Sequence, residues 1–152
     1  MRVTVKSSLP PEEVLQAARD FSDRRADIWP MVQAKYLQVH ETGETFAEVT
    51  EGTFVLGRFW ERNRYDWSEP GVVKATVMES NIFKPGSTFA LRASQRNGGS
   101  SVELTVNRDF QSGLRGRFAS AVNHGFGDRW RRTAWGMVLQ QALGKVEKRQ
   151  GD

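Results

Sequence analysis

Hydrophobic and polar residues alternate along most of the first two-thirds of this chain, which is the pattern of half-buried β-strands. A short alternating run comes first, at Val3–Ser7, and apolar residues at helical spacing then continue to Phe21. A second short helix is expected around Arg25 to Met31. Six further strands are predicted, at Tyr36–His40, Thr45–Thr50, Gly57–Trp67, Val72–Glu79, Thr88–Ser94 and Ser101–Phe110. Because short, turn-rich connections separate them, we expect an antiparallel meander.

From Gly113 to Arg149 the spacing becomes helical, but one straight amphipathic helix does not fit it. At about 100° per residue, the apolar stripe that contains Leu114 and Phe118 lies roughly opposite the one that contains Trp130 and Met137. The two phases meet at Gly125-Phe126-Gly127-Asp128, where two glycines weaken a helix and an aspartate could cap a new one. The sequence therefore predicts a short helix, a break and a long C-terminal helix. The short helix either packs over the edge of the domain or acts as a lid whose apolar face meets a ligand or a membrane.

Composition places the chain among ordinary globular domains, with 152 residues, 38% hydrophobic and 26% charged. It has no cysteine, which excludes disulfides and thiolate metal sites. The net charge is +4, and the segment from Gly113 onward carries eight Lys and Arg against three acidic residues. We interpret this as the solvated side of an amphipathic helix and expect no nucleic-acid partner. The start lacks the pattern of a signal peptide and no apolar run reaches about 20 residues, so we expect a cytoplasmic protein.

The order of a strand, two small helices, a meander and a long C-terminal helix resembles the helix-grip fold of the START-related (SRPBCC) superfamily. Its most specific stretches are Thr50–Thr53, Phe59–Trp67 and Gly71–Val77, which are similar to bacterial polyketide cyclase/dehydrase-type proteins. The resemblance covers essentially the whole chain. It implies an α+β fold in residues 1–152, with a curved antiparallel sheet of about seven strands wrapped around the C-terminal helix and two small helices after the first strand. It also implies a cavity between the sheet and that helix, but no single reaction.

Alternation predicts which strand residues face this cavity. In Phe59–Trp67 one face holds Arg62, Arg64 and Asp66 beside Trp60, and should meet water, so the other face should point inward. We expect Arg62 and Arg64 to be exposed, and the following residues to be buried: Phe59, Tyr65, Val77, Phe89, Leu91 and Val106. The predicted ligand-binding residues are Glu61, Asn63, Tyr65, Trp67, Val77, Phe89, Leu91, Arg108, Trp130 and Met137.

Glu61 needs a partner if it is buried, because an isolated carboxylate in an apolar interior costs several kcal/mol. Arg108 is the candidate partner, since it follows Val102, Leu104 and Val106 on the inward side of its strand. One interpretation makes these groups polar anchors of an otherwise apolar ligand site. The other makes Glu61 half of an ion pair that only ties the sheet together. Large rings such as Tyr65 line cores as well as pockets, and Glu51 faces inward too unless a bulge reverses the register.

The sequence lacks the motifs of metal sites, of serine hydrolases and of nucleotide-binding loops. The two histidines, His40 and His124, are far apart and have no carboxylate at metal-ligand spacing, so we expect no metal site. The chain has no Gly-x-Ser-x-Gly elbow of a hydrolase, and its glycine pairs lack the context of nucleotide loops. We therefore expect no cofactor.

The leading hypothesis is binding of a small hydrophobic molecule, namely a lipid, a polyketide or an aromatic metabolite. The alternative is a polyketide aromatase/cyclase or dehydratase, in which Arg108 stabilises developing negative charge and Glu61 or Tyr65 moves protons. A third hypothesis makes the basic C-terminal helix an interaction surface, and the helix before Gly125 also suits peripheral membrane contact. The sequence leaves the oligomeric state open.

Overall fold

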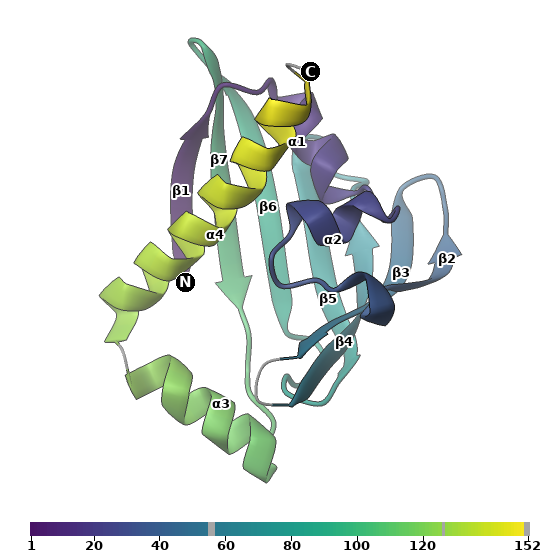
Figure 1. Cartoon of the computed structure of the whole chain (residues 1–152), viewed down its shortest axis with the longest axis vertical. Helices are drawn as coiled ribbons and strands as arrows, with labels where there is room; N and C mark the ends of the chain where they lie inside the picture. The colour runs from purple at the N-terminus through teal and green to yellow at the C-terminus, as the bar shows by residue number, and fades with distance from the viewer. Residues whose placement is uncertain (55–56, 126, 151–152) are drawn as a thin grey trace.

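A computed structural model describes residues 1–54, 57–125 and 127–150. Seven strands in these residues form one curved antiparallel sheet in the order β1-β7-β6-β5-β4-β3-β2 (Figure 1). The strands are β1 (Arg2–Ser7), β2 (Gln38–Thr42), β3 (Phe46–Phe54), β4 (Arg58–Asp66), β5 (Val72–Ser80), β6 (Thr88–Arg96) and β7 (Gly99–Asn107). Strands β2 to β6 each pair with the next strand in the sequence, and β1 pairs with β7 at the far edge. The predicted meander and the α+β helix-grip architecture are therefore confirmed.

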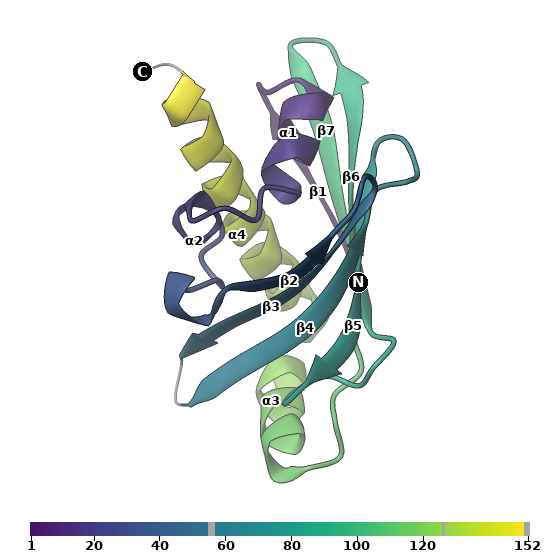
Figure 2. The same ribbon diagram turned by 90° about the vertical axis from the view of Figure 1, so that its right-hand side faces the viewer.

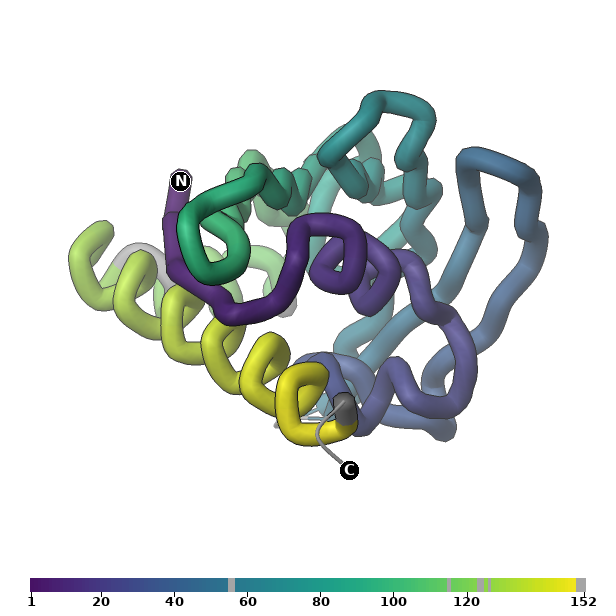
Figure 3. Tube along the Cα trace, turned by 90° about the horizontal axis from the view of Figure 1, so that it is seen from above, coloured from purple at the N-terminus to yellow at the C-terminus, as the bar shows by residue number. Residues whose placement is uncertain are grey.

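The helices lie on the concave side of the sheet (Figure 2). They are α1 (Pro11–Ala18), α2 (Arg24–Ile28), α3 (Leu114–Gly125) and α4 (Gly127–Gln150). Viewed from above, α4 and the β2–β3 hairpin lie at opposite sides of the molecule, and α1 lies between them (Figure 3). In the described part of the chain no helix combines the length and the apolar character needed to cross a membrane.

The strand register confirms the predicted inward face. Tyr65 on β4 lies opposite Ala47 on β3 and Ala75 on β5, and Leu91 lies between Val73 and Leu104. These side chains pack with apolar residues of β1, α1 and α4 into one hydrophobic core. Of the residues expected to be buried, Tyr65, Val77 and Leu91 are buried, whereas Phe59, Phe89 and Val106 are only half-buried. The difference follows from their position, because the core fills the α1 end of the concave face.

The charged face of β4 points away from the core, as the sequence predicts. Arg62 and Arg64 are about 40% exposed, and both pair with Glu48 of the neighbouring strand. Hydrogen bonds from these guanidinium groups lower the pKa of Glu48 from its ordinary value.

Several strand boundaries differ from the sequence prediction, and β3 continues to Phe54, four residues past the predicted end at Thr50. Ala34–Tyr36 forms a turn of 3₁₀ helix, so β2 begins at Gln38 and not at Tyr36. Strand β7 ends at Asn107, and the chain then leaves the sheet with Arg108 and Phe110 beyond its last pair. The local backbone hydrogen bonds at Ala34–Tyr36 compete with strand pairing, and an alternating pattern does not reveal this competition.

The predicted break in the C-terminal helix is present. Helix α3 ends at Gly125 and α4 begins at Gly127, which has a left-handed φ of 72° that a residue with a Cβ rarely adopts. Phe126, which was part of the predicted break, lies outside the described residues. Helix α4 crosses β1 where Gly136 meets Val3, and its first turns project past the edge of the sheet (Figure 1).

Two neighbouring residues of α4 test this placement. Leu139 is 1% exposed and packs in the core, whereas Met137 is 60% exposed. We expect Leu139→Ala to lower the free energy of unfolding by about 3 kcal/mol, because it leaves a cavity. Met137→Ala should change it by less than about 0.5 kcal/mol. Urea unfolding followed by circular dichroism measures both, and equal losses would contradict the crossing described here.

Candidate ligand site on the concave face

Two carboxylates lie directly opposite each other on the concave face. Glu51 of β3 and Glu61 of β4 are cross-strand partners in the register, and both point to the side of the sheet that α1, α2 and α4 cover. Like charges in this position repel each other. The fold compensates each of them with a different arginine.

Arg25 of α2 neutralises Glu51 in a buried network. Its Nε pairs with Glu51 Oε1, and its Nη2 donates to the Tyr65 hydroxyl over 3.0 Å. The Tyr65 hydroxyl in turn donates to Glu51 Oε2. Arg25 Nη1 donates to the carbonyl oxygens of Ala18 and Asp20. All three nitrogens of the guanidinium group have acceptors, so this pair fastens the α1–α2 segment to the sheet.

Protonation states in this network are fixed by burial and by charge. Burial, reinforced by the Glu51 carboxylate, raises the pKa of Tyr65 well above its ordinary value. Burial alone would lower the pKa of Arg25, but the charge of Glu51 and the Tyr65 hydroxyl raise it overall. At neutral pH Arg25 is therefore charged, and the Tyr65 hydroxyl keeps its proton.

Arg108 neutralises the second carboxylate. Its Nη2 donates to Glu61 Oε1 over 2.8 Å, and the two side chains are only 12% and 17% exposed. The guanidinium group lies 4.5 Å from the Phe83 ring and 5.3 Å from the Phe89 ring. Aromatic faces attract a cation, so the two rings hold Arg108 beside Glu61.

The Glu61–Arg108 pair is incompletely satisfied, unlike the Arg25 network. Glu61 Oε2 and Arg108 Nε are buried and have no hydrogen-bond partner among the described residues. Asn63 follows Glu61 on the same face and is completely buried, and both its amide nitrogen and its amide oxygen are also without partners there. Such groups each cost about 1–3 kcal/mol when buried, and native structures contain few of them. Glu61, Asn63 and Arg108, which we call the polar cluster, thus retain unused hydrogen-bonding capacity.

A bulge shapes the sheet beside this cluster. Between Arg62 and Asn63 the pairing of β4 with β5 shifts, so that Asn63 lies opposite Val77 and Glu61 lies opposite Ser80. Bulges bend a strand and redirect its side chains, and they are common next to functional sites.

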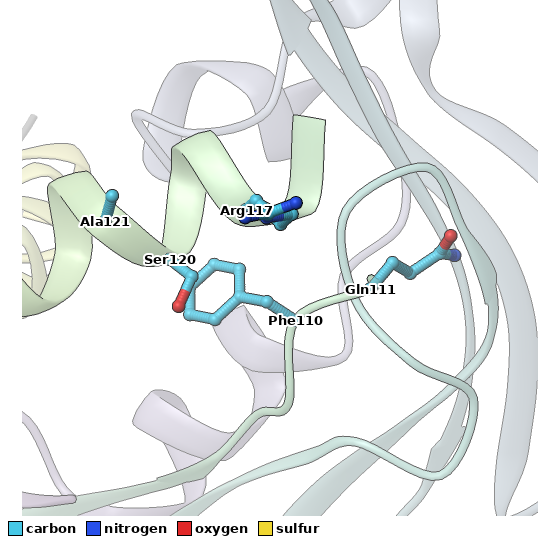
Figure 4. Close-up of a pocket in the computed structure, with 5 residues that line it drawn as sticks. All are labelled: Phe110, Gln111, Arg117, Ser120 and Ala121. Carbon is cyan, nitrogen blue, oxygen red and sulfur yellow. The ribbon is translucent and has the colours of Figure 1, made fainter. Parts of the chain in front are cut away.

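An open hollow of about 350 Å³ lies between α3 and the segment that follows β7. Its lining consists of Phe110, Gln111, Arg117, Ser120 and Ala121. Figure 4 shows the Phe110 ring beside Ser120 of α3, while Gln111 points away from that helix. The Phe110 and Phe83 rings are 5.3 Å apart, and Phe83 contacts Arg108. One pair of aromatic rings therefore separates this hollow from the polar cluster.

The structure brings together some of the residues predicted to bind ligand and separates others. Val77 pairs with Asn63 across the strands, and Phe89 contacts Arg108, so both adjoin the polar cluster. Leu91 is buried in the hydrophobic core. The Tyr65 ring contacts Phe89, but its hydroxyl is held by Glu51 and Arg25. Three predicted residues lie elsewhere, namely Trp67, whose indole donates to the Glu44 carbonyl, and Trp130 and Met137, which are 53% and 60% exposed on α4.

Trp130 and Met137 are exposed because their stripe of α4 does not face the sheet. The buried side chains of α4 are those of Leu139, Ala142 and Leu143. Trp130 comes before the crossing at Gly136, in the part of the helix that projects past β1 (Figure 1).

Sequence reasoning missed Arg25 and Phe83. A signal for Arg25 exists, because Phe21, Arg25 and Trp29 recur at helical spacing and would place a cation among aromatic residues. The structure does put the Arg25 guanidinium 4.5 Å from the Phe21 ring. No comparable pattern marks Phe83, which lies in the irregular turn after β5.

Of the two histidines, the structure describes only the side chain of His40, which is not part of the polar cluster. His40 is exposed on β2, as expected, and contacts the Thr50 hydroxyl over 2.7 Å. The side chain of His124 lies outside the described part of the chain.

Solved structures identify the fold. The protein TTHA0849 from Thermus thermophilus is 14% identical, with a TM-score of 0.76 and coverage of 97% of both chains. The Zhui aromatase/cyclase from a Streptomyces species is 19% identical, with a TM-score of 0.75 over 98% of this chain and 93% of its own. A START superfamily protein from Mycobacterium smegmatis is 8% identical, with a TM-score of 0.69 and coverage of 97% of both chains. No family model and no curated protein matches the sequence. The chain thus has the START-like helix-grip fold that the resemblance implied.

The buried hydroxyl of Tyr65 gives a pH-dependent prediction. A tyrosine in an unfolded chain ionises near pH 10, whereas folded Tyr65 keeps its proton to higher pH. The folded state then binds more protons than the unfolded state above about pH 10, so its stability falls as pH rises there. We expect Tyr65→Phe to cost about 1–2 kcal/mol at pH 7, because Arg25 and Glu51 lose a partner, and to flatten this alkaline slope.

Urea unfolding of both proteins between neutral pH and pH 11 measures the effect. Parallel pH profiles for the wild type and Tyr65→Phe would show that the hydroxyl is not buried in this network.

Proposed function

We propose that this protein binds a small, largely apolar molecule whose oxygen-bearing end is held by the polar cluster. The observation that carries the proposal is Asn63, a completely buried side chain with neither amide atom satisfied within the described chain. A ligand that hydrogen-bonds to Asn63 would recover the free energy that burial of this side chain costs.

The free atoms of the cluster indicate the chemistry of that ligand. Asn63 Nδ2 and Arg108 Nε offer donors, which suit a carbonyl oxygen. Glu61 Oε2 and Asn63 Oδ1 offer acceptors, which suit a hydroxyl group. Donors and acceptors on the same face of the sheet favour a molecule that carries both a carbonyl and a hydroxyl group, as polyketides and phenolic metabolites do.

The apolar body of the ligand would lie against the half-buried end of the sheet. Phe59, Phe89 and Val106 face inward there but are not fully covered, in contrast to the packed α1 end. The hollow beside Phe110 provides space on the same side, one aromatic pair away from Arg108. Apolar walls with a few convergent polar groups are the usual composition of small-molecule sites.

The ion pair alone does not decide between the two interpretations of Glu61. A purely structural pair would also join Glu61 to Arg108, as observed. A structural pair is stabilising only when its remaining atoms are satisfied, and this condition holds for Arg25 and Glu51. It does not hold for Glu61 and Arg108 within the described chain, so the ligand-binding interpretation is favoured.

Paired substitutions test the proposal. Asn63→Leu removes the amide at nearly constant volume, so it should leave the free energy of unfolding unchanged or raise it. It should weaken binding of naphthol about fivefold, the value of one hydrogen bond, and leave binding of naphthalene unchanged. Tryptophan fluorescence titration measures both affinities. Ser100→Ala is the matched control, because Ser100 is equally buried with an unsatisfied hydroxyl but lies at the start of β7.

Two results would contradict the proposal. The first is wild-type protein that does not distinguish naphthol from naphthalene. The second is a large loss of stability in Asn63→Leu with naphthol binding retained, which would show that the amide has a structural partner.

A second candidate function, a dehydratase or cyclase, is favoured by the free Glu61 oxygen beside two hydrogen-bond donors. Glu61 would remove the proton α to a ligand carbonyl, while Arg108 and Asn63 donate to the oxygen on which negative charge develops. The protonated Glu61 would then return the proton to the departing hydroxyl group, so that one water molecule leaves. The aromatase/cyclase activity named for the Zhui protein agrees with this chemistry. Tyr65 is not assigned a role, because its proton is held in the Arg25 network.

The aldol adduct of benzaldehyde and acetone tests this second function, because its dehydration gives benzylideneacetone, which absorbs in the near ultraviolet. We expect wild-type protein to accelerate that reaction and Glu61→Gln to abolish the acceleration while the adduct still binds. Acceleration that persists in Glu61→Gln would exclude Glu61 as the base. No acceleration by the wild type, with the adduct bound, would leave the protein a binding protein.

A further inference from the structure

Helix α3 carries an apolar stripe that faces solvent. Leu114, Phe118 and Val122 are 87%, 60% and 45% exposed, and their spacing of four residues places them on one face of the helix. Scattered exposed apolar residues are common, but three in one line on a short helix form a continuous surface.

The opposite side of α3 packs against the segment that precedes the helix. Gly116 is buried, and a Cβ atom there would collide with the backbone of Gln111. At about 100° per residue, Gly116 lies nearly opposite Phe118 on the helix. The close approach at Gly116 therefore fixes α3 with its apolar stripe turned outward.

The segment that carries the stripe, together with most of α4, is basic. Between Gln111 and Val146 the sequence has six Lys and Arg and a single acidic residue, Asp128, which pairs with Arg131. The side chains of Arg117, Arg129 and Arg132 are exposed. Helix α3 also forms one end of the molecule along its longest axis (Figure 1).

We propose that α3 docks on a membrane surface that contains anionic lipids. Leu114, Phe118 and Val122 enter the boundary between headgroups and acyl chains, and the exposed arginines of α3 and of the first turns of α4 contact lipid phosphates. An apolar face flanked by arginines is the arrangement of interfacial amphipathic helices. Each basic residue near an anionic surface adds to the affinity.

Two other surfaces could cover this stripe, a second copy of the chain or the protein's own concave face, and the structure argues against both. In a two-fold dimer the same basic surface would face itself, and the arginines would repel one another. Closure of the stripe onto the concave face would require α3 to leave the contact of Gly116 with Gln111. An anionic bilayer satisfies both the apolar stripe and the positive charge.

Vesicle flotation tests the proposal without any bound ligand, so its result is independent of the proposed binding site. We expect the protein to float with vesicles of phosphatidylcholine and phosphatidylglycerol but not with phosphatidylcholine alone, and less as salt rises. Phe118→Ser should weaken binding about tenfold, because it removes one inserted apolar side chain. Arg129→Gln combined with Arg132→Gln should weaken it by a similar factor.

Val39→Ser is the matched control, because Val39 is 43% exposed on β2, away from α3, and its substitution should not change flotation. Thermal unfolding should be the same in all variants, since every substituted side chain is exposed in the free protein. Absence of flotation, equal flotation with both kinds of vesicle, or full binding by Phe118→Ser would overturn the proposal. So would a concentration-dependent dimer that Phe118→Ser dissociates, because the stripe would then be a self-association surface.

Discussion

The structure depends on the electrostatic compensation of two glutamates on neighbouring strands. Glu51 and Glu61 face each other on the concave side, where their like charges repel each other. Each has its own arginine, Arg25 from α2 and Arg108 from the end of β7. Since one arginine precedes the meander and the other follows it, the sheet can hold both carboxylates only when α2 and the segment after β7 are in place.

The two compensated pairs divide the concave face into two regions with different properties. Around Arg25 every polar atom of the network has a partner, and Phe21 and Tyr65 cover the ion pair. Around Arg108 polar atoms remain free, and the apolar neighbours are only half-buried. The first region has the properties of a structural core, and the second has those of a binding surface.

Much of this arrangement could be predicted from the sequence, because alternation is a direct consequence of strand geometry. It placed Glu61, Asn63 and Arg108 on the inner face and located the helix break at Gly125–Gly127. It could not show that Arg25 reaches Glu51, since that contact joins residues from elements whose packing no local pattern encodes. It also could not show which stripe of α4 faces the sheet. Trp130 and Met137 are as apolar as the buried Leu139, and only the crossing at Gly136 distinguishes them.

The separation of the Arg25 network from the polar cluster has a consequence for divergence. The network uses Glu51 and Tyr65 from β3 and β4, and the cluster uses different residues of β4 together with Arg108. Under the proposed function, substitutions at Glu61, Asn63 or Arg108 would alter ligand selectivity and leave in place the interactions that attach α2 to the sheet. The proposed specificity can therefore change while the Arg25 network is kept, provided that Glu61 and Arg108 change together, because either one alone would leave an uncompensated charge. The same independence makes this face a practical starting point for designing binding proteins for other oxygen-bearing molecules.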